Sequence, residues 1–207
     1  KKSKMFPLQK CIILCFALII TTSAETCPGL NKMPNFNMTA FLGIWYEQAN
    51  FNSLLDNNKG FPQCKGINIV TDGNGNYAAQ EKAFIMSENR YGEVVKRTSV
   101  LDGNIQVNIN DNDIETIRIY YNRDQGRFYN NGIRNHFYVI DSDYTNYAII
   151  AACSYTSDSI TILTRTKSIP ETKDKANVNN KISEALEKYG LHQCDFKFVS
   201  NECSSNY

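Results

Sequence analysis

Downstream of residue 42, apolar and polar side chains alternate with a period of two, as expected for half-buried β-strands. Eight such segments are separated by short polar stretches: Ile44–Asn50, Lys65–Thr71, Tyr77–Ile85, Glu93–Val100, Glu115–Tyr121, Ile133–Ile140, Tyr147–Tyr155 and Ser159–Thr166. Short strands at a spacing of roughly 8–12 residues, joined by tight turns, predict an antiparallel sandwich or barrel.

Residues that favour turns separate several of these strands. Asp72-Gly73-Asn74-Gly75 predicts a hairpin, because Gly and Asn accept the positive φ that tight hairpin turns require. We predict further turns around Asn89, at Asp102-Gly103-Asn104 and at Asp124-Gln125-Gly126. Residues 25–42 are irregular by the same criteria, with one helical turn near Thr39.

One late segment has helical rather than strand spacing. Pro170 marks its start and Gly190 its end. Its apolar residues recur every three or four positions: Val178, Ile182, Ala185, Leu186 and Tyr189. A short final strand is predicted over Phe196–Ser200. The sequence shows no internal repeat and no low-complexity linker, so we expect one all-β domain with a single late helix.

The first 24 residues have the composition of a secretory leader. Lys10 precedes the apolar run Cys11–Ile20, and the small residues Thr22-Ser23-Ala24 follow it. The run is too short to cross a bilayer, which needs about 20 residues, and a buried N-terminal helix is the competing interpretation. We therefore expect Met5 to be the initiator, residues 1–24 to be upstream sequence and a cleaved signal peptide, and residues 25–207 to form a secreted, extracellular domain without a membrane span.

Cleavage of this leader changes the charge and the cysteine count. The chain has 22 Lys+Arg and 21 Asp+Glu, and residues 1–24 contain four lysines and no acid, so the mature charge is 18 − 21 = −3. This mildly acidic balance gives no basic patch for nucleic acid. Five cysteines remain, an odd number that leaves one thiol over when the others pair in an oxidising compartment. Asn37-Met38-Thr39 is a glycosylation sequon.

Three sequence blocks resemble the lipocalin family. They are Gly43-x-Trp45-Tyr46, Ser142-Asp143-Tyr144-Thr145-Asn146-Tyr147-Ala148 and Leu163-Thr164-Arg165, and they occur in the family's order and spacing. The resemblance covers essentially the whole mature chain. It implies an eight-stranded antiparallel up-and-down β-barrel with one C-terminal α-helix and a short final strand. It also implies that Trp45 packs across the closed end of the barrel, with Arg165 over its indole, as a structural floor that does not choose the ligand.

The cysteines resemble those of the branch that contains apolipoprotein D, insect bilin-binding protein and insecticyanin. Cys27-Pro28 precedes the first block, and Cys64, Cys153 and Cys203 lie at positions that match the branch. The resemblance implies the disulfides Cys27–Cys153 and Cys64–Cys203. Cys194 is then the free thiol, although a Cys64–Cys194 pairing remains open.

In this family the inward-facing residues of each strand line the ligand cavity. Alternation, together with the resemblance in the late strands, assigns the following side chains to the ligand-binding interior: Ile67, Ile69, Glu81, Ala83, Val95, Arg97, Ser99, Ile117, Ile119, Tyr121, Asn135, Phe137, Val139, Ala148, Ile150, Ala152 and Ser154. A shift of one residue in register would reverse these assignments. Arg97 is expected to pair with a ligand carboxylate or with Glu81, unless both lie at the rim in water.

The resemblance implies a carrier of one small hydrophobic ligand, either a bilin such as biliverdin or a retinoid, carotenoid or other lipid. The alternative is an interaction protein or pigment-complex subunit that uses the barrel as a scaffold. We expect no enzymatic activity, required cofactor or metal site, because His136 and His192 are the only histidines and Cys194 lies outside the predicted cavity. Both a monomer and a homo-oligomer, including one linked through Cys194, remain open.

Overall fold

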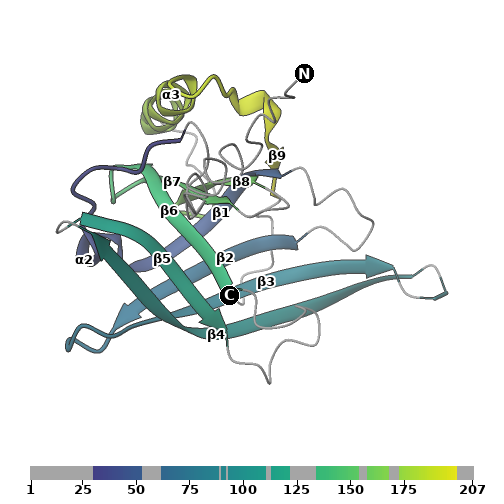
Figure 1. The fold of residues 1–207 in the computed structure, drawn as a ribbon. Helices are drawn as coiled ribbons and strands as arrows, with labels where there is room; N and C mark the ends of the chain where they lie inside the picture. Colours follow the sequence, from purple (N-terminus) through teal and green to yellow (C-terminus); the bar gives the residue numbers. More distant parts are fainter. Residues whose placement is uncertain are drawn as a thin grey trace, which may run out of the picture.

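A computed structural model of the protein describes residues 30–52, 62–88, 90–91, 93–110, 113–121, 134–153, 158–167 and 173–199. The described helices and strands follow one another along the chain as α2 (Met38–Phe41), β1 (Gly43–Asn52), β2 (Pro62–Thr71), β3 (Tyr77–Glu88), β4 (Val94–Asn110), β5 (Asp113–Tyr121), β6 (Arg134–Ser142), β7 (Tyr147–Cys153), β8 (Asp158–Thr164), α3 (Lys173–Glu187), η3 (Gln193–Asp195) and β9 (Lys197–Phe198) (Figure 1). The predicted leader, residues 1–24, lies outside the described residues.

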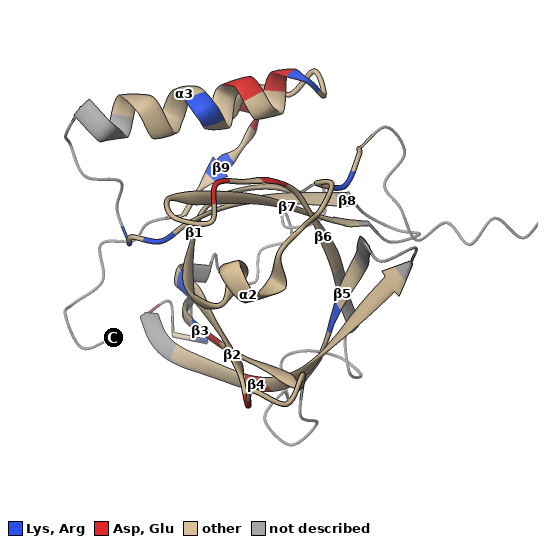
Figure 2. Cartoon of the chain, turned by 90° about the vertical axis from the view of Figure 1, so that its left-hand side faces the viewer, with Lys and Arg blue, Asp and Glu red and all other residues tan. Residues whose placement is uncertain are grey.

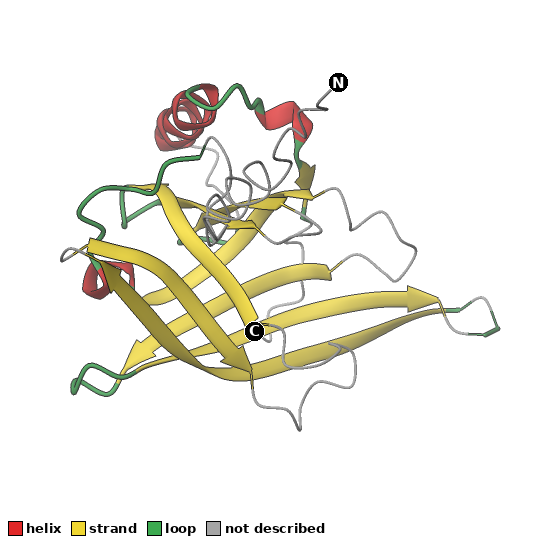
Figure 3. Ribbon diagram, viewed as in Figure 1, coloured by secondary structure: helices red, strands yellow, loops and turns green. Residues whose placement is uncertain are grey.

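The strands form one closed antiparallel sheet. Each of β2 to β7 pairs with the next strand, β8 pairs with β1, and β1 pairs back with β2, which closes the ring. The short strand β9 bonds to β1 from outside. The predicted eight-stranded antiparallel barrel with a late helix and a short final strand is therefore confirmed (Figure 3).

One predicted turn is wrong. Asp102-Gly103-Asn104 lies in the middle of β4, which continues without interruption from Val94 to Asn110. Gly103 pairs with Ala79 on one side and Tyr121 on the other, and Asp102 accepts a hydrogen bond from Gln80 Nε2 at 2.8 Å. The backbone of these residues therefore pairs with the strands on both sides, β3 and β5. This pairing outweighs the local preference of Asp-Gly-Asn for a turn.

The predicted hairpin after Thr71 has the expected geometry. Gly73 has a φ of +81° and Gly75 a φ of +89°, and the Asp72 carboxylate accepts hydrogen bonds from the backbone N–H groups of Asn74 and Asn76. The predicted turns around Asn89 and at 124–126 lie outside the described residues, as does Pro170.

The apolar core has two parts, one on each face of the sheet. The outer part lies between α3 and the outer faces of β6, β7 and β8, where Ile182 and Leu186 of the helix pack against Tyr138, Ile149 and Ile162. The inner part fills one end of the barrel beneath α2. In Figure 2 the strands form a ring with α2 across it, and α3 lies outside. None of the helices described is long and apolar enough to span a membrane.

Candidate ligand-binding site

The floor of the barrel is built around the tryptophan. Trp45 is fully buried, and its Nε1 donates a hydrogen bond to the Phe41 carbonyl at 2.8 Å. The Phe41 ring stacks on the indole at 5.0 Å between centroids, so that α2 and β1 form one aromatic unit. The Arg165 guanidinium carbon lies 3.6 Å from the centre of the Trp45 ring. The aromatic floor that the resemblance implied, with arginine over tryptophan, is present in the structure.

Arg165 also closes the floor through its hydrogen bonds. Nε donates to the Tyr144 carbonyl at 3.0 Å, and the two terminal nitrogens donate to the carbonyls of Ile44 and Ala40 at 3.2 Å each. Burial lowers the pKa of Arg165, although an arginine stays charged at any physiological pH. Gly43 allows this approach, because its φ is +97° and an added Cβ would lie 3.1 Å from a guanidinium nitrogen.

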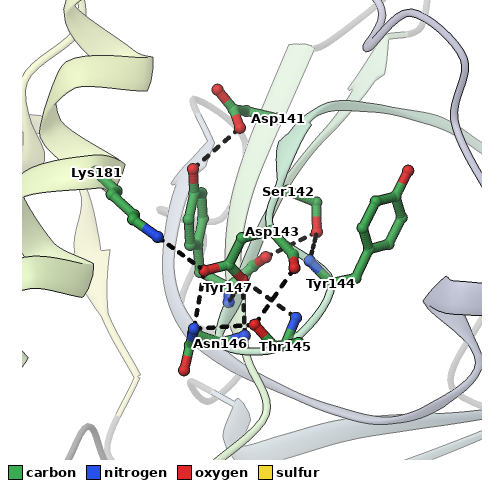
Figure 4. A network of polar contacts seen from close by, with 8 residues as sticks. All are labelled: Asp141, Ser142, Asp143, Tyr144, Thr145, Asn146, Tyr147 and Lys181. Carbon is green, nitrogen blue, oxygen red and sulfur yellow. Dashed lines mark hydrogen bonds and ion pairs between the residues drawn. The ribbon is translucent and has the colours of Figure 1, made fainter. Parts of the chain in front are cut away.

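The turn between β6 and β7 ties the floor to α3 (Figure 4). The Asp143 carboxylate accepts hydrogen bonds from the backbone N–H groups of Thr145, Asn146 and Tyr147, and from the Asn146 side chain at 2.8 Å. It also pairs with Lys181 on α3, whose Nζ lies 3.4 Å from Oδ2. Burial raises the pKa of Asp143, but these bonds outweigh burial and hold it below its ordinary value.

Two tyrosines extend the same network. Tyr147 donates a hydrogen bond to Asp141 at 3.0 Å, and its pKa is raised by burial and then by the negative charge of Asp141. The Tyr144 hydroxyl accepts a hydrogen bond from the Asn37 backbone at 2.9 Å, and its ring stacks on Phe36. The second sequence block therefore forms the turn between β6 and β7 and connects this turn to α2 and α3.

Asn37 begins α2. Its side-chain oxygen accepts a hydrogen bond from the Ala40 N–H at 3.1 Å, the geometry of an N-cap, and the residue is exposed. Glycosylation at this sequon stays a prediction.

Above the floor, the inward rows of β2 and β7 become partly accessible, whereas Ala83 on β3 and Phe137 on β6 stay buried. On β7 the inward residue Ala148 is fully buried, whereas Ile150 and Ala152, which follow it toward the other end, are only partly buried. On β2, Ile69 is buried and Ile67 is partly buried in the same way. Apolar side chains that point into the barrel and still contact solvent indicate an interior that is sealed at the floor and open above it.

The structure places most of the predicted ligand-binding residues in this interior. The following belong to the inner cluster, pack against it, or lie on the same face of their strand as one of its members: Ile67, Ile69, Glu81, Ala83, Ile117, Ile119, Phe137, Val139, Ala148, Ile150 and Ala152. Ser154 and the side chains of Val95, Arg97, Tyr121 and Asn135 lie outside the described residues. That any of these residues contacts a ligand stays a prediction.

The sequence analysis missed a group of polar residues in the interior, which we call the polar wall: Glu47, Asn50, Lys65, Glu81 and Thr161. Lys65 Nζ lies 3.1 Å from Glu47 Oε2 and 3.6 Å from Glu81 Oε1. Asn50 Nδ2 donates to Thr161 Oγ1 at 2.9 Å and approaches Glu47 Oε1 at 3.4 Å. Only Glu81 was predicted; the alternation from Trp45 also indicates Glu47, but a register shift between Glu47 and Ala49 brings Asn50 inward.

The structure tests only part of the predicted disulfide pairing. Cys64 is disulfide-bonded, and Cys194 is an exposed free thiol, which rules out the alternative pairing of Cys64 with Cys194. The pairings Cys27–Cys153 and Cys64–Cys203 stay predictions. The described residues contain no group of His, Cys, Asp and Glu side chains suited to a metal ion, and His192 is exposed at the start of η3.

A closed antiparallel barrel with a sealed floor and an accessible apolar interior defines a protein of the ligand-binding barrel class. The model of the lipocalin / cytosolic fatty-acid binding protein family matches residues 91–200, and the chain belongs to this family. Its members bind small hydrophobic ligands, are generally not enzymes and are typically secreted. No curated protein sequence matches the chain.

Several solved structures share the fold. Insecticyanin from the tobacco hornworm Manduca sexta is 19% identical, with a TM-score of 0.61 over 87% of this chain and 88% of that one. The tryptamine complex of the amine binding protein of Rhodnius prolixus is 18% identical, with a TM-score of 0.62 over 83% and 85%. The cockroach allergen Per a 4 is 19% identical, with a TM-score of 0.58 over 85% and 95%. At identities this low, these similarities show a common fold and no more than that.

Proposed function

We propose that the protein is a secreted carrier that sequesters one small hydrophobic molecule inside the barrel. The observation that carries the proposal is the change in exposure along β7, from the sealed Ala148 to the accessible Ile150 and Ala152. An interior that was simply filled by its own side chains would bury all three. Apolar walls with a few polar groups are also the usual lining of small-molecule sites.

Biliverdin is the first specific candidate, with a retinoid or another lipid next. The bilin rests on the cysteine pattern that resembles the insecticyanin branch, and the fold shared with insecticyanin is compatible with it. The amine binding protein with its tryptamine ligand shows that similar barrels also take other molecules. No cofactor is required for such a carrier, and residues 1–24 would direct its secretion.

The test is direct titration of the mature chain with biliverdin and with retinol. Binding of biliverdin produces a red-region absorbance band, and binding of retinol raises its fluorescence. Ala152→Trp fills the accessible interior and should weaken binding at least tenfold, about 1.4 kcal/mol. The matched control is Val70→Trp, because Val70 is exposed on the outer face of β2. A chain that binds neither compound, or an A152W variant that binds as well as the wild type, would contradict the carrier function.

The second candidate is an interaction protein or pigment-complex subunit. It is favoured by the outward and exposed Ile44 and Val70 on neighbouring strands, and by the exposed thiol of Cys194. Native mass spectrometry of protein from its natural source distinguishes the two functions, since a carrier retains a small molecule and a subunit retains a protein. A dimer band on a non-reducing gel that disappears in Cys194→Ser would show a linkage between chains.

A further inference from the structure

The turn that joins β2 to β3 contains an asparagine followed by a glycine. Asn74 and Gly75 lie in the turn 72–76, and every residue of this turn is exposed. In an Asn-Gly pair the backbone nitrogen of the glycine can attack the side-chain carbonyl carbon of the asparagine, because glycine has no Cβ to obstruct the approach. This reaction releases ammonia, so the state of the two reacting groups decides whether the turn is chemically stable.

The attacking group, the Gly75 nitrogen, is unengaged. The N–H groups of the other turn residues all donate hydrogen bonds: Asp72 to the Asn76 carbonyl, Gly73 to Thr71 Oγ1, and both Asn74 and Asn76 to Asp72 Oδ1. Within the described structure the Gly75 N–H donates to no acceptor. A Cβ added at Gly75 would find nothing within 4 Å, so the residue also has open space around it.

The group under attack, the Asn74 side chain, is equally unrestrained. Among the described residues its amide takes part in no hydrogen bond, and only its backbone N–H is engaged. Asn76 in the same turn differs, because its side-chain nitrogen donates to Asp72 Oδ2 at 2.7 Å and its carbonyl accepts from Thr71 Oγ1 at 3.0 Å. Asn76 is also followed by Tyr77 rather than by glycine. The turn therefore contains one free asparagine and one restrained asparagine.

We propose that Asn74 is a site of spontaneous deamidation in the folded protein. The Gly75 nitrogen loses its proton and bonds to Asn74 Cγ, and the side-chain nitrogen leaves as ammonia, which closes a succinimide ring. Water then opens the ring. Its attack at Cγ gives aspartate, whereas its attack at the backbone carbonyl carbon gives isoaspartate, in which the chain runs through Cβ and Cγ. The net change is uptake of water and loss of ammonia, with no oxidant or reductant.

Both products alter the turn. Hydrogen bonds from the Asn76 side chain and from the Asn74 backbone hold the pKa of Asp72 below its ordinary value, so a new carboxylate at position 74 meets a like charge in the same turn. Isoaspartate also lengthens the backbone between Thr71 and Tyr77, which form the last pair of the β2–β3 ladder. Deamidation should therefore loosen this end of the hairpin, and it does so whether or not the barrel carries a ligand.

The test is peptide mapping of the mature chain by mass spectrometry after incubation in warm, mildly alkaline buffer. Residue 74 should gain about 1 Da, and an isoaspartyl methyltransferase should label it. Fragmentation of the tryptic peptide between Lys65 and Lys82 separates Asn74 from Asn76, and Asn74 should react at least about tenfold faster. The rate should rise with pH, because attack requires the Gly75 nitrogen to lose its proton.

Two variants make the readout specific to this site. Asn74→Gln keeps an amide but requires a larger and slower ring closure, so methyl labelling of the hairpin should disappear. Asn131→Gln is the matched control, because Asn131-Gly132 is the other Asn-Gly pair of the sequence and lies outside the described residues. In N131Q the labelling at residue 74 should persist. Near-ultraviolet circular dichroism verifies that each variant is folded.

Two results would overturn the proposal. The first is an Asn74 that keeps its mass in the folded chain and changes only in urea, since the folded turn would then hold its side chain away from the Gly75 nitrogen. The second is deamidation of Asn74 and Asn76 at equal rates in the folded chain, since the free N–H and the glycine would then have no effect.

Discussion

Replacement of Arg165 by alanine should destabilise the barrel by about 1.5–4 kcal/mol. The cation–π contact with Trp45 accounts for about 0.5–2 kcal/mol, because the guanidinium lies 3.6 Å from the ring centre and is partly shielded. The hydrogen bond to the Tyr144 carbonyl is partly buried and adds about 1–2 kcal/mol. The bonds to Ile44 and Ala40 are exposed, so water replaces them at little cost.

Urea unfolding followed by tryptophan fluorescence measures this change at its source, since Trp45 is the single tryptophan of the chain. Arg165→Lys keeps the charge and loses the three hydrogen bonds of the planar guanidinium, so its stability should lie between that of the alanine variant and the wild type. Lys188→Ala is the surface control, because Lys188 is exposed and its ion-pair partner among the described residues is Asp141, at 3.6 Å. This variant should change stability by less than about 0.5 kcal/mol.

A loss below about 0.5 kcal/mol for R165A, or an R165K variant as stable as the wild type, would refute this account of the floor. The loss should not vary from about pH 6 to pH 9, because arginine keeps its charge throughout this range. Ligand affinity of the folded variant should be unchanged, since the floor residues lie below the accessible rows.

Three further predictions concern the same end of the barrel. Gly43→Ala should cost about 1–3 kcal/mol in urea unfolding, from its positive φ together with the approach of Arg165, whereas Gly73→Ala, with open space around its φ of +81°, should cost less; equal losses would contradict the role of the close approach. Protonation of Asp143 should destabilise the fold. Because its folded pKa is lowered, its contribution is present above about pH 4 and is lost as the pH falls through the folded value, so the stability gap between wild type and D143N should shrink in acid; a constant gap would contradict this. Asn37→Gln should remove one glycan by mass spectrometry of the secreted protein and lower stability by about 0.5–2 kcal/mol through loss of the N-cap, while a mass that differs only by the added methylene would show that the sequon is not used.

The architecture and the inward rows were predictable because one physical rule governs both. Alternation places every second residue on one face, so Ile67 and Ile69, or Ile117 and Ile119, could be assigned to the interior from the sequence. The floor was predictable for a different reason: Gly43, Trp45 and Arg165 belong to sequence blocks that resemble those of a known family.

Two features could not be predicted, because each depends on contacts between distant parts of the chain. Asp102-Gly103-Asn104 favours a turn locally, and it is extended only because β3 and β5 pair with it from both sides. Asn50 should face outward by strict alternation from Trp45, and only the irregular register between β1 and β8 turns it inward. One polar residue of the interior was therefore hidden by a single β-bulge.

The short strand β9 has a consequence for the behaviour of the protein in solution. β1 pairs with β2 only from Gly43 to Tyr46, and β9 pairs with the next part of β1, with Val199 donating to the Gln48 carbonyl at 2.8 Å. Without β9 this length of β1 would be an exposed sheet edge, which readily pairs with strands of other molecules. The segment that follows α3 thus protects the barrel from self-association through its edge, and loss of this segment would favour aggregation of an otherwise folded domain.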